Sequence, residues 1–261
     1  MTVTAVPPAV RGLVWGLVDY AGLFPPAGLP MPAAVANYAA YHASDDSWAL
    51  GRFVVPAARL AEFEDAAATV GAGTGANPWT VSLLVASPAE LSVVVPFNAR
   101  WAGRIVIDAI EGKAGSVEQV GSLAAARPAG TELFVELVVG PALAATLGEV
   151  RRVGASAKIR AGGTTPEAFP AVDDVVAFLR ACHAARVPFK ATAGLHHPVR
   201  GLYRLTYAPD SPVGTMHGYL NVLVAAEAIA NGGTDADAQR VMLAESAHDL
   251  VITDDRIAWA G

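Results

Sequence analysis

The sequence predicts a single α/β domain, a (β/α)8 TIM-like barrel. Short apolar, β-branched runs recur about every 25–30 residues, and Ala-rich segments that suit helices separate them. The runs are apolar on both faces, as buried parallel strands are. Eight of them in 261 residues match the size of such a barrel. A doubly wound open parallel sheet is the alternative; we favour the barrel because polar residues end many different strands.

The expected strands are the apolar runs at residues 13–19, 52–56, 79–85, 104–109, 133–138, 157–160, 188–192 and 250–253. Several of the expected helices open with Pro or with Ser, Thr or Asp, as helices often do: 32–42, 57–69, 88–94, 116–126, 141–150 and 166–185. The long interval around 200–247 is expected to be a helical insertion, with helices at 217–231 and 235–247. No repeat or linker is visible, so residues 1–261 are expected to form one domain.

The composition of the chain argues against some classes of binding partner. With 18 Lys+Arg against 24 Asp+Glu, it has no basic surplus to meet nucleic-acid phosphates. No targeting or membrane segment is expected, because the longest uncharged stretch, 66–89, is broken by Gly and Pro. The single cysteine, Cys182, excludes an internal disulfide and fits a cytoplasmic location. Only 16% of residues are charged, so we expect apolar surface and a homo-oligomer.

Lysine is rare in this chain. The 18 cationic residues comprise 15 Arg and only three Lys, at Lys113, Lys158 and Lys190. A chain that supplies positive charge almost entirely with Arg makes the position of each remaining Lys informative.

Polar residues stand where the expected strands end, which is where barrels place their active sites: Asp19, Asp108, Glu136, Lys158, Arg160, Lys190 and Thr192. Side chains alternate along a strand, so Lys158 and Arg160 share one face. That face should point into the barrel, because the apolar residues between them must pack on helices. The same alternation turns Glu136 and Lys190 inward, beside Lys158.

This cluster suggests carbonyl chemistry. A lysine near other cations in a dry pocket loses pKa and can attack a carbonyl carbon as a free amine. Lys190 is one candidate, with Lys158 and Arg160 as the depressing charges and Glu136 as proton acceptor. An inert Glu136–Lys158 ion pair that fills the barrel would account for two of the same residues.

Gly162 and Gly163 follow the Lys158 strand and precede an expected helix. Backbone N–H groups at such a place can approach an anion closely, and the Arg160 guanidinium would add a second contact. A tight βα turn that leads through Thr and Pro into the helix is the alternative.

Two segments resemble class I aldolases of the deoxyribose-phosphate aldolase type. Residues 158–167 (KIRAGGTTPE) resemble their lysine strand and Gly-Gly phosphate loop, and residues 189–194 (FKATAG) are similar to their Schiff-base lysine strand. The likeness covers about 40 residues, and the two motifs occur in the reverse order. It implies a barrel and a carbonyl substrate, with Lys190 or Lys158 as the reactive lysine.

Histidines are the third candidate feature. His196 and His197 lie in a Gly- and Pro-bracketed loop after the Lys190 strand, and His217 lies one helical turn before Asn221. They suit acid–base catalysis, a divalent metal shared with an acidic residue, or a structural role. The loop that begins at Asp19 is either a pocket wall or a packed apolar loop.

We therefore expect a barrel enzyme that acts on a small anionic oxygenated substrate through a carbonyl, enolate or Schiff-base intermediate, as a lyase, an aldolase or an isomerase does. Lys190, Lys158, Glu136, His196 and His197 are the catalytic candidates. The substrate-binding candidates are Arg160, Gly162, Gly163, Thr192, Asp19, His217 and Asn221. The alternatives are a metal-dependent lyase or hydrolase that uses His196, His197 and His217, and a non-catalytic binding or scaffold barrel. No nucleotide-binding fingerprint is present; a divalent metal is the one cofactor left open.

Overall fold

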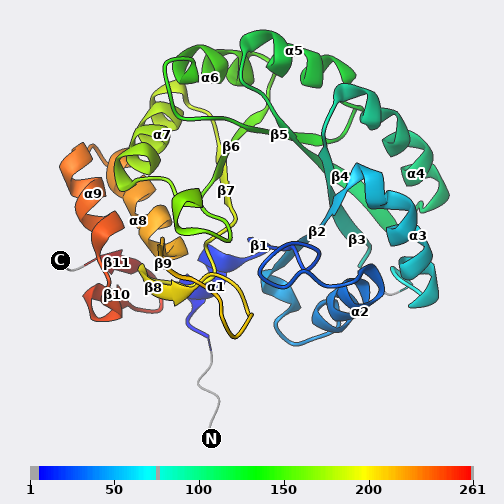
Figure 1. Cartoon of the computed structure of the whole chain (residues 1–261), viewed down its shortest axis with the longest axis horizontal. Coiled ribbons are helices and arrows are strands. Elements are labelled where there is room, and N and C mark those ends of the chain that lie inside the picture. The colour runs from blue at the N-terminus through cyan, green and yellow to red at the C-terminus, as the bar shows by residue number, and fades with distance from the viewer. Residues whose placement is uncertain (1–5, 75–76, 260–261) are drawn as a thin grey trace, which may run out of the picture.

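The computed structural model describes residues 6–74 and 77–259, which form an α/β fold around one curled parallel sheet. Seven strands lie side by side in chain order, each parallel to the next. They are β1 (Val18–Tyr20), β2 (Leu50–Pro56), β3 (Trp79–Val85), β4 (Ile105–Lys113), β5 (Glu132–Glu136), β6 (Ser156–Arg160) and β7 (Phe189–Thr192). The sheet bends through an arc that encloses an inner face (Figure 1).

The helices that connect these strands lie outside the arc (Figure 1). They are α2 (Met31–His42), α3 (Leu60–Thr69), α4 (Val94–Arg100), α5 (Val117–Ala126), α6 (Leu143–Arg152) and α7 (Val172–Ala185). A doubly wound sheet reverses its strand order and carries helices on both faces. The sequential order and one-sided helices observed here rule out that alternative.

The sheet is a half-barrel rather than a closed eight-stranded barrel. Among the described residues, β1 and β7 are its edges and do not pair with each other. The eighth strand expected at 250–253 is instead β10 (Leu250–Ile252), in an antiparallel hairpin with β11 (Ile257–Trp259). A four-residue turn, in which Thr253 N–H donates to Arg256 O at 2.9 Å, supplies that partner locally.

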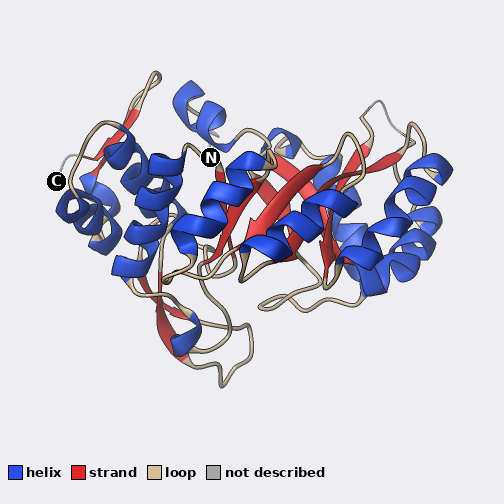
Figure 2. Cartoon of the chain, turned by 90° about the horizontal axis from the view of Figure 1, so that it is seen from above, coloured by secondary structure: helices blue, strands red, loops and turns tan. Residues whose placement is uncertain are grey.

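The interval 200–247 is not wholly helical. It begins with a second hairpin, β8 (Gly201–Arg204) and β9 (Val213–Met216), which projects from the body of the molecule (Figure 2). Two helices follow, α8 (Tyr219–Ala230) and α9 (Asp235–Leu243). The hairpin was missed because its strands are short and carry Gly201 and Gly214, which dilute the apolar alternation.

Other expected boundaries also need correction. The expected strand 13–19 is divided: residues 13–14 end the helix α1 (Pro8–Val14), residues 15–17 form a turn that contains Gly16 with φ +60°, and residues 18–19 begin the short β1. The expected helix 88–94 is a 3-10 helix at Pro88–Val93, and the α-helix α4 begins only at Val94. The expected helix 166–185 begins only at Val172, since Pro170 has no N–H to donate within a helix.

The two faces of the sheet differ in polarity, and this difference positions the site. Outward side chains such as Phe53, Val55 and Ile107 are fully buried under the helices. The inward side chains are largely polar and ionised, as described below. No helix in the described ranges has the length and apolarity that crossing a membrane requires.

Candidate functional site

Charged side chains from adjacent strands meet on the inner face of the half-barrel. Glu136 on β5 is the register partner of Lys158 on β6, and Lys158 is the partner of Lys190 on β7. On β6, the residues on either side of Lys158 are Ala157 and Ile159, and both are buried on the outer face of the sheet. Alternation along parallel strands therefore places Glu136, Lys158 and Lys190 side by side.

Lys158 is buried between two carboxylates. Its Nζ lies 2.7 Å from Glu111 Oε2 and 2.9 Å from Glu136 Oε2, and its side chain is only 7% exposed. A charged group at such depth is costly unless opposite charge compensates it. Two carboxylates provide that charge.

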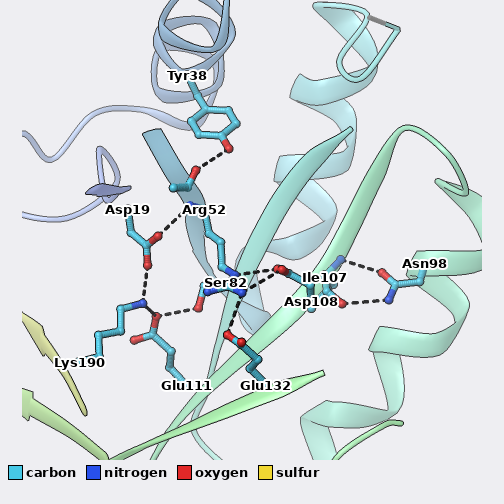
Figure 3. Close-up of polar contacts among 11 residues, drawn as sticks. Asp19, Tyr38, Arg52, Ser82, Asn98, Ile107, Asp108, Glu111, Glu132 and Lys190 are labelled. Atoms are coloured by element: carbon cyan, nitrogen blue, oxygen red, sulfur yellow. Dashed lines mark hydrogen bonds and ion pairs between the residues drawn. The ribbon is translucent and has the colours of Figure 1, made fainter. Parts of the chain in front are cut away.

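Lys190 lies beside Lys158, on the edge strand β7. Its Nζ donates to Glu111 Oε1 at 2.7 Å and to Asp19 Oδ2, and it lies 4.9 Å from the centre of the Phe134 ring. Figure 3 shows Lys190 between the carboxylates of Asp19 and Glu111. Since Asp19 is on β1, this ion pair spans the gap between the two edges of the sheet.

Lys113 extends the network to the solvent. Its Nζ lies 3.2 Å from Glu136 Oε1, and its side chain is 75% exposed. The three lysines of the chain therefore join one alternating series: Asp19, Lys190, Glu111, Lys158, Glu136 and Lys113. Three carboxylates balance three ammonium ions, so the series has no net charge.

Glu111, at the centre of this series, was missed by the sequence analysis. The expected strand ended at residue 109, whereas β4 runs on to Lys113. A bulge at Asp108 also shifts the pairing of β4 with β3: Ile107 pairs with Val81, but Ala109 pairs with Ser82. Strict alternation from an inward Asp108 would turn Glu111 outward; the extra residue turns it inward.

Buried Glu111 is held as a carboxylate by its partners. Burial alone would raise its pKa, but the ammonium groups of Lys190 and Lys158 outweigh burial and lower the pKa to about 2. Ser82 Oγ also donates to its Oε1 at 2.7 Å. Glu136 behaves alike: the charges of Lys158 and Lys113 overcome burial and lower its pKa.

The expectation that a neighbouring lysine lowers the pKa of Lys190 is wrong in direction. Burial does act to lower that pKa, but the charges of Glu111 and Asp19 outweigh burial and raise it. The two lysines are register partners, yet Glu111 stands between their ammonium groups and contacts both. Lys190 is therefore a stable cation rather than a free amine.

A cleft opens where β2 to β5 end, the side of the sheet on which barrel enzymes carry their sites. Its volume is about 430 Å³, within the range of small-molecule sites. The charged residues that line it are Glu90, Glu111, Lys113, Glu136 and Lys158. Lys158 thus combines burial with access to a ligand-sized space.

Arg160 and Thr192 lie one step further along β6 and β7, on the same face as the lysines. Arg160 is exposed, and its Nε donates to Gly162 O at 3.1 Å, which ties the guanidinium to the following loop. Neither residue lines the cleft.

Packing accounts for the glycine at 162. A Cβ there would lie 2.4 Å from the Phe169 ring and 2.8 Å from the Gly194 Cα, so the loops after β6 and β7 touch at this point. A Cβ at Gly163 would lie 2.7 Å from the Ala168 side chain. The phosphate role that the aldolase resemblance implies for these glycines stays a prediction.

The histidines lie away from the cleft lining, beyond β7. His196 is exposed, and His197 stacks on Tyr203 of β8 with ring centres 3.5 Å apart. His217 is 4% exposed, and its Nε2 lies 2.8 Å from Pro170 O. Burial is the main cause that lowers the pKa of His217, which leaves the ring neutral at pH 7.

Asn221 has a structural task. It is fully buried, its Oδ1 accepts from Arg200 N–H at 2.8 Å, and its Nδ2 donates to Val241 O and Ala244 O. These bonds join α8 to the loop before β8 and to the end of α9. With its amide used in this way, Asn221 has no hydrogen left to donate to a substrate.

Asp108 lies at the end of the inner face that is farther from the cleft, where it binds Arg52. Its two oxygens accept from Arg52 Nε at 2.8 Å and Nη2 at 2.9 Å, and the same guanidinium contacts Glu132 (Figure 3). Asp19 connects the two ends, since its Oδ1 accepts from Arg52 N–H at 2.7 Å. Asp19 is therefore part of the charged network, and the loop expected to begin at Asp19 begins only after Tyr20, at the end of β1.

Within the ranges 6–74 and 77–259, no three His, Cys, Asp or Glu side chains are grouped as metal ligands would be. The loop of His196 and His197 does lie beside the residues that follow His217, since Tyr219 N–H donates to His197 O at 3.0 Å. The metal-dependent alternative that uses these three histidines stays a prediction.

Comparison of the chain with protein-family models and with curated protein sequences finds no match.

Proposed function

We propose that this chain is an enzyme that moves a proton on a small anionic carbonyl compound through an enolate intermediate. The observation that carries the proposal is Lys158, a buried ammonium ion on the lining of a cleft at the strand ends. A fixed positive charge in a low-dielectric site stabilises an oxyanion that forms during reaction. Isomerisation and carbon–carbon cleavage both pass through such an intermediate.

Glu136 is the proposed proton acceptor. Its Oε2 lies 2.9 Å from Lys158 Nζ, so a carbonyl oxygen held by the lysine would bring its α-carbon near this carboxylate. The C–H bond breaks, the proton goes to Glu136, and the electron pair moves onto the carbonyl oxygen beside Lys158. Return of the proton to a different carbon, or to the same one, restores the carboxylate.

Lys113 is the proposed anchor for the carboxylate of the substrate. It lines the cleft, has one carboxylate partner among the described residues, Glu136 at 3.2 Å, and is largely exposed, so it can turn toward an incoming anion. Arg160, further along the inner face, adds positive charge at the mouth of the half-barrel.

A charge-stabilising lysine suits this site better than a Schiff-base lysine. Nucleophilic attack needs a free amine, and the carboxylates beside Lys190 raise its pKa. Lys190 also lies outside the cleft lining, behind Glu111. We therefore assign the reacting oxygen to Lys158 and give Lys190 the role of holding Glu111 in place.

Exchange of carbon-bound protons with solvent tests this function without knowledge of the natural reaction. The wild-type chain is incubated with 2-oxobutyrate in D2O, and loss of the C3 proton signal is followed by NMR. We expect exchange well above the buffer rate, and a decrease of at least about 100-fold in Lys158→Met, the usual cost of removing one oxyanion-stabilising group. Wild-type exchange at the buffer rate, or an undiminished rate in Lys158→Met, would refute the proposal.

Arg52→Met is the matched control. It removes a cation of the same inner face whose carboxylate partners lie at the opposite end of the sheet from the cleft. Loss of stability without loss of exchange in Arg52→Met would show that the Lys158 effect is chemical. Equal loss of exchange in both variants would assign the effect to general damage of the inner face.

A further inference from the structure

The cleft has two chemically different walls. The inner-face residues of β4 to β6 supply the ionised wall formed by Glu111, Lys113, Glu136 and Lys158. The opposite wall comes from the ends of β2 and β3 and the turns after them. It consists of Pro56, Ala57, Ala58, Leu84, Val85 and Ala86, together with Glu90, whose Oε2 accepts from Ala86 N–H at 2.6 Å.

The apolar wall continues across two neighbouring strands. Leu84 is the register partner of both Pro56 and Glu111, so one layer across the inner face changes from apolar on β2 and β3 to charged on β4. Apart from the Glu90 carboxylate, which already accepts from Ala86 N–H, no side chain of this wall carries a hydrogen-bonding atom. Hydroxyl groups of a bound ligand placed against the six apolar residues would lose water without gaining side-chain partners.

We infer that the substrate is a 2-oxo acid or a similar carbonyl acid with a short hydrocarbon chain, rather than a polyhydroxylated sugar phosphate. The inference rests on the proposed function: the carbonyl and carboxylate oxygens face Lys158 and Lys113, and the hydrocarbon chain lies along the apolar wall. The largely apolar wall disfavours a polyhydroxylated sugar phosphate.

The dependence of affinity on chain length tests this inference. Titration calorimetry of the wild-type chain with pyruvate, 2-oxobutyrate, 2-oxopentanoate and 2-oxohexanoate should give a Kd that falls about fourfold per added methylene, the effect of burying one CH₂ group. Ribose 5-phosphate should bind no more tightly than inorganic phosphate. A flat series, no measurable heat with any of the four acids, or tighter binding of ribose 5-phosphate would overturn the inference.

Two variants localise the effect to the apolar wall. Leu84→Asn should flatten the series, and Ala58→Asp, at an exposed position of the same wall, should do so where Leu84→Asn fails to fold. Leu202→Asn is the matched control: this leucine is 71% exposed on β8, outside the cleft, and its loss should leave the slope intact. A slope that persists in both wall variants would overturn the inference.

Lys158→Met separates this inference from the proposed function. A flat series in the wild type, together with loss of pyruvate binding in Lys158→Met, would reject the chain-length inference and leave the proposed role of Lys158 standing. A preserved slope with unchanged affinity in Lys158→Met would support the apolar wall and reject the proposed role of Lys158.

Discussion

Glu111 contacts both lysines of the inner face. Each of its oxygens faces a different ammonium group, Oε1 toward Lys190 and Oε2 toward Lys158, both at 2.7 Å. Removing the charge of one member of a buried ion network leaves the others uncompensated, which commonly costs about 3–5 kcal/mol. The stability of this chain should therefore depend on Glu111 more than on its exposed carboxylates.

Glu111→Gln is predicted to destabilise the fold in a pH-dependent manner. The folded pKa of Glu111, about 2, lies below its ordinary value of 4.5, so its contribution is complete above pH 4.5 and is lost as the pH falls toward 2. The variant should lose about 3 kcal/mol at pH 7, measured by urea unfolding, and the gap to the wild type should narrow below pH 4.5. A gap that stays constant from pH 7 to pH 3 would show that the Glu111 charge is not what stabilises the site.

Sequence reasoning found the residues that obey strand alternation and missed the one that does not. Glu136, Lys158 and Lys190 lie on uninterrupted strands whose other face is apolar, so their orientation follows from neighbouring residues. Glu111 lies beyond a bulge, and a bulge changes the phase of alternation without a composition signal. The acid at 111 and the lysine at 113, alternating along an apolar run, were the only hint.

At the scale of elements, the bulge in β4 has a second consequence on the outer face. Once Glu111 turns inward, Gly112 must turn outward, toward α5. A Cβ on Gly112 would lie 3.0 Å from both Leu123 Cδ1 and Cδ2. Strand β4 and helix α5 therefore approach each other closely because residue 112 has no side chain.

Gly112→Val is predicted to cost about 1–3 kcal/mol, the usual cost of overpacking a core. Urea unfolding measures the loss, and Gly148→Val is the control, because Gly148 is exposed on α6 with nothing within 4 Å of an added Cβ. Equal stability of Gly112→Val and the wild type would mean that residue 112 does not face α5, and the inward position of Glu111 would then be in error.

The expected helices and strands agree with the structure where the segments between consecutive strands are short, and they disagree in the long segment after β7. Strand β3 has the expected bounds, and most helices between β2 and β6 start within a few residues of their expected starts. The segment after β7 was misassigned because two hairpins satisfy their backbone bonds locally. The hydrophobic pattern of one strand does not indicate which other strand it will pair with.

At the scale of the whole molecule, the two open edges of the sheet are connected by a side-chain ion pair. The edges β1 and β7 are joined by Lys190 and Asp19 rather than by backbone hydrogen bonds. Open sheet edges are usually covered or charged in native proteins. Here a partly buried ion pair, with both side chains 16% exposed, links the two edges across the open side.

Asp19→Asn is predicted to loosen the open side of the half-barrel. Asparagine retains an oxygen for Arg52 N–H but removes the charge that faces Lys190. Hydrogen exchange followed by mass spectrometry should show faster exchange in β1 and β7, with β3 and β4 unchanged. Uniform protection across the sheet in the variant would contradict a closing role for this ion pair.

Self-association of the chain stays a prediction. Leu202, Val213 and Tyr207 on the projecting β8–β9 hairpin are 71%, 49% and 78% exposed, an apolar surface that a second copy would cover. Light scattering should give a mass that is a multiple of the 26.8 kDa chain. A monomeric mass at micromolar concentration would exclude a stable oligomer.

The scarcity of lysine permits one direct measurement of the central claim, that Lys158 and Lys113 receive the substrate. A chain labelled with ¹³C at lysine Cε gives three signals, which the three single Lys→Arg variants assign. During titration with 2-oxobutyrate, the Lys158 and Lys113 signals should shift together and saturate, while the Lys190 signal changes little. A shift confined to Lys190, or no shift in any of the three signals, would contradict this account of the site.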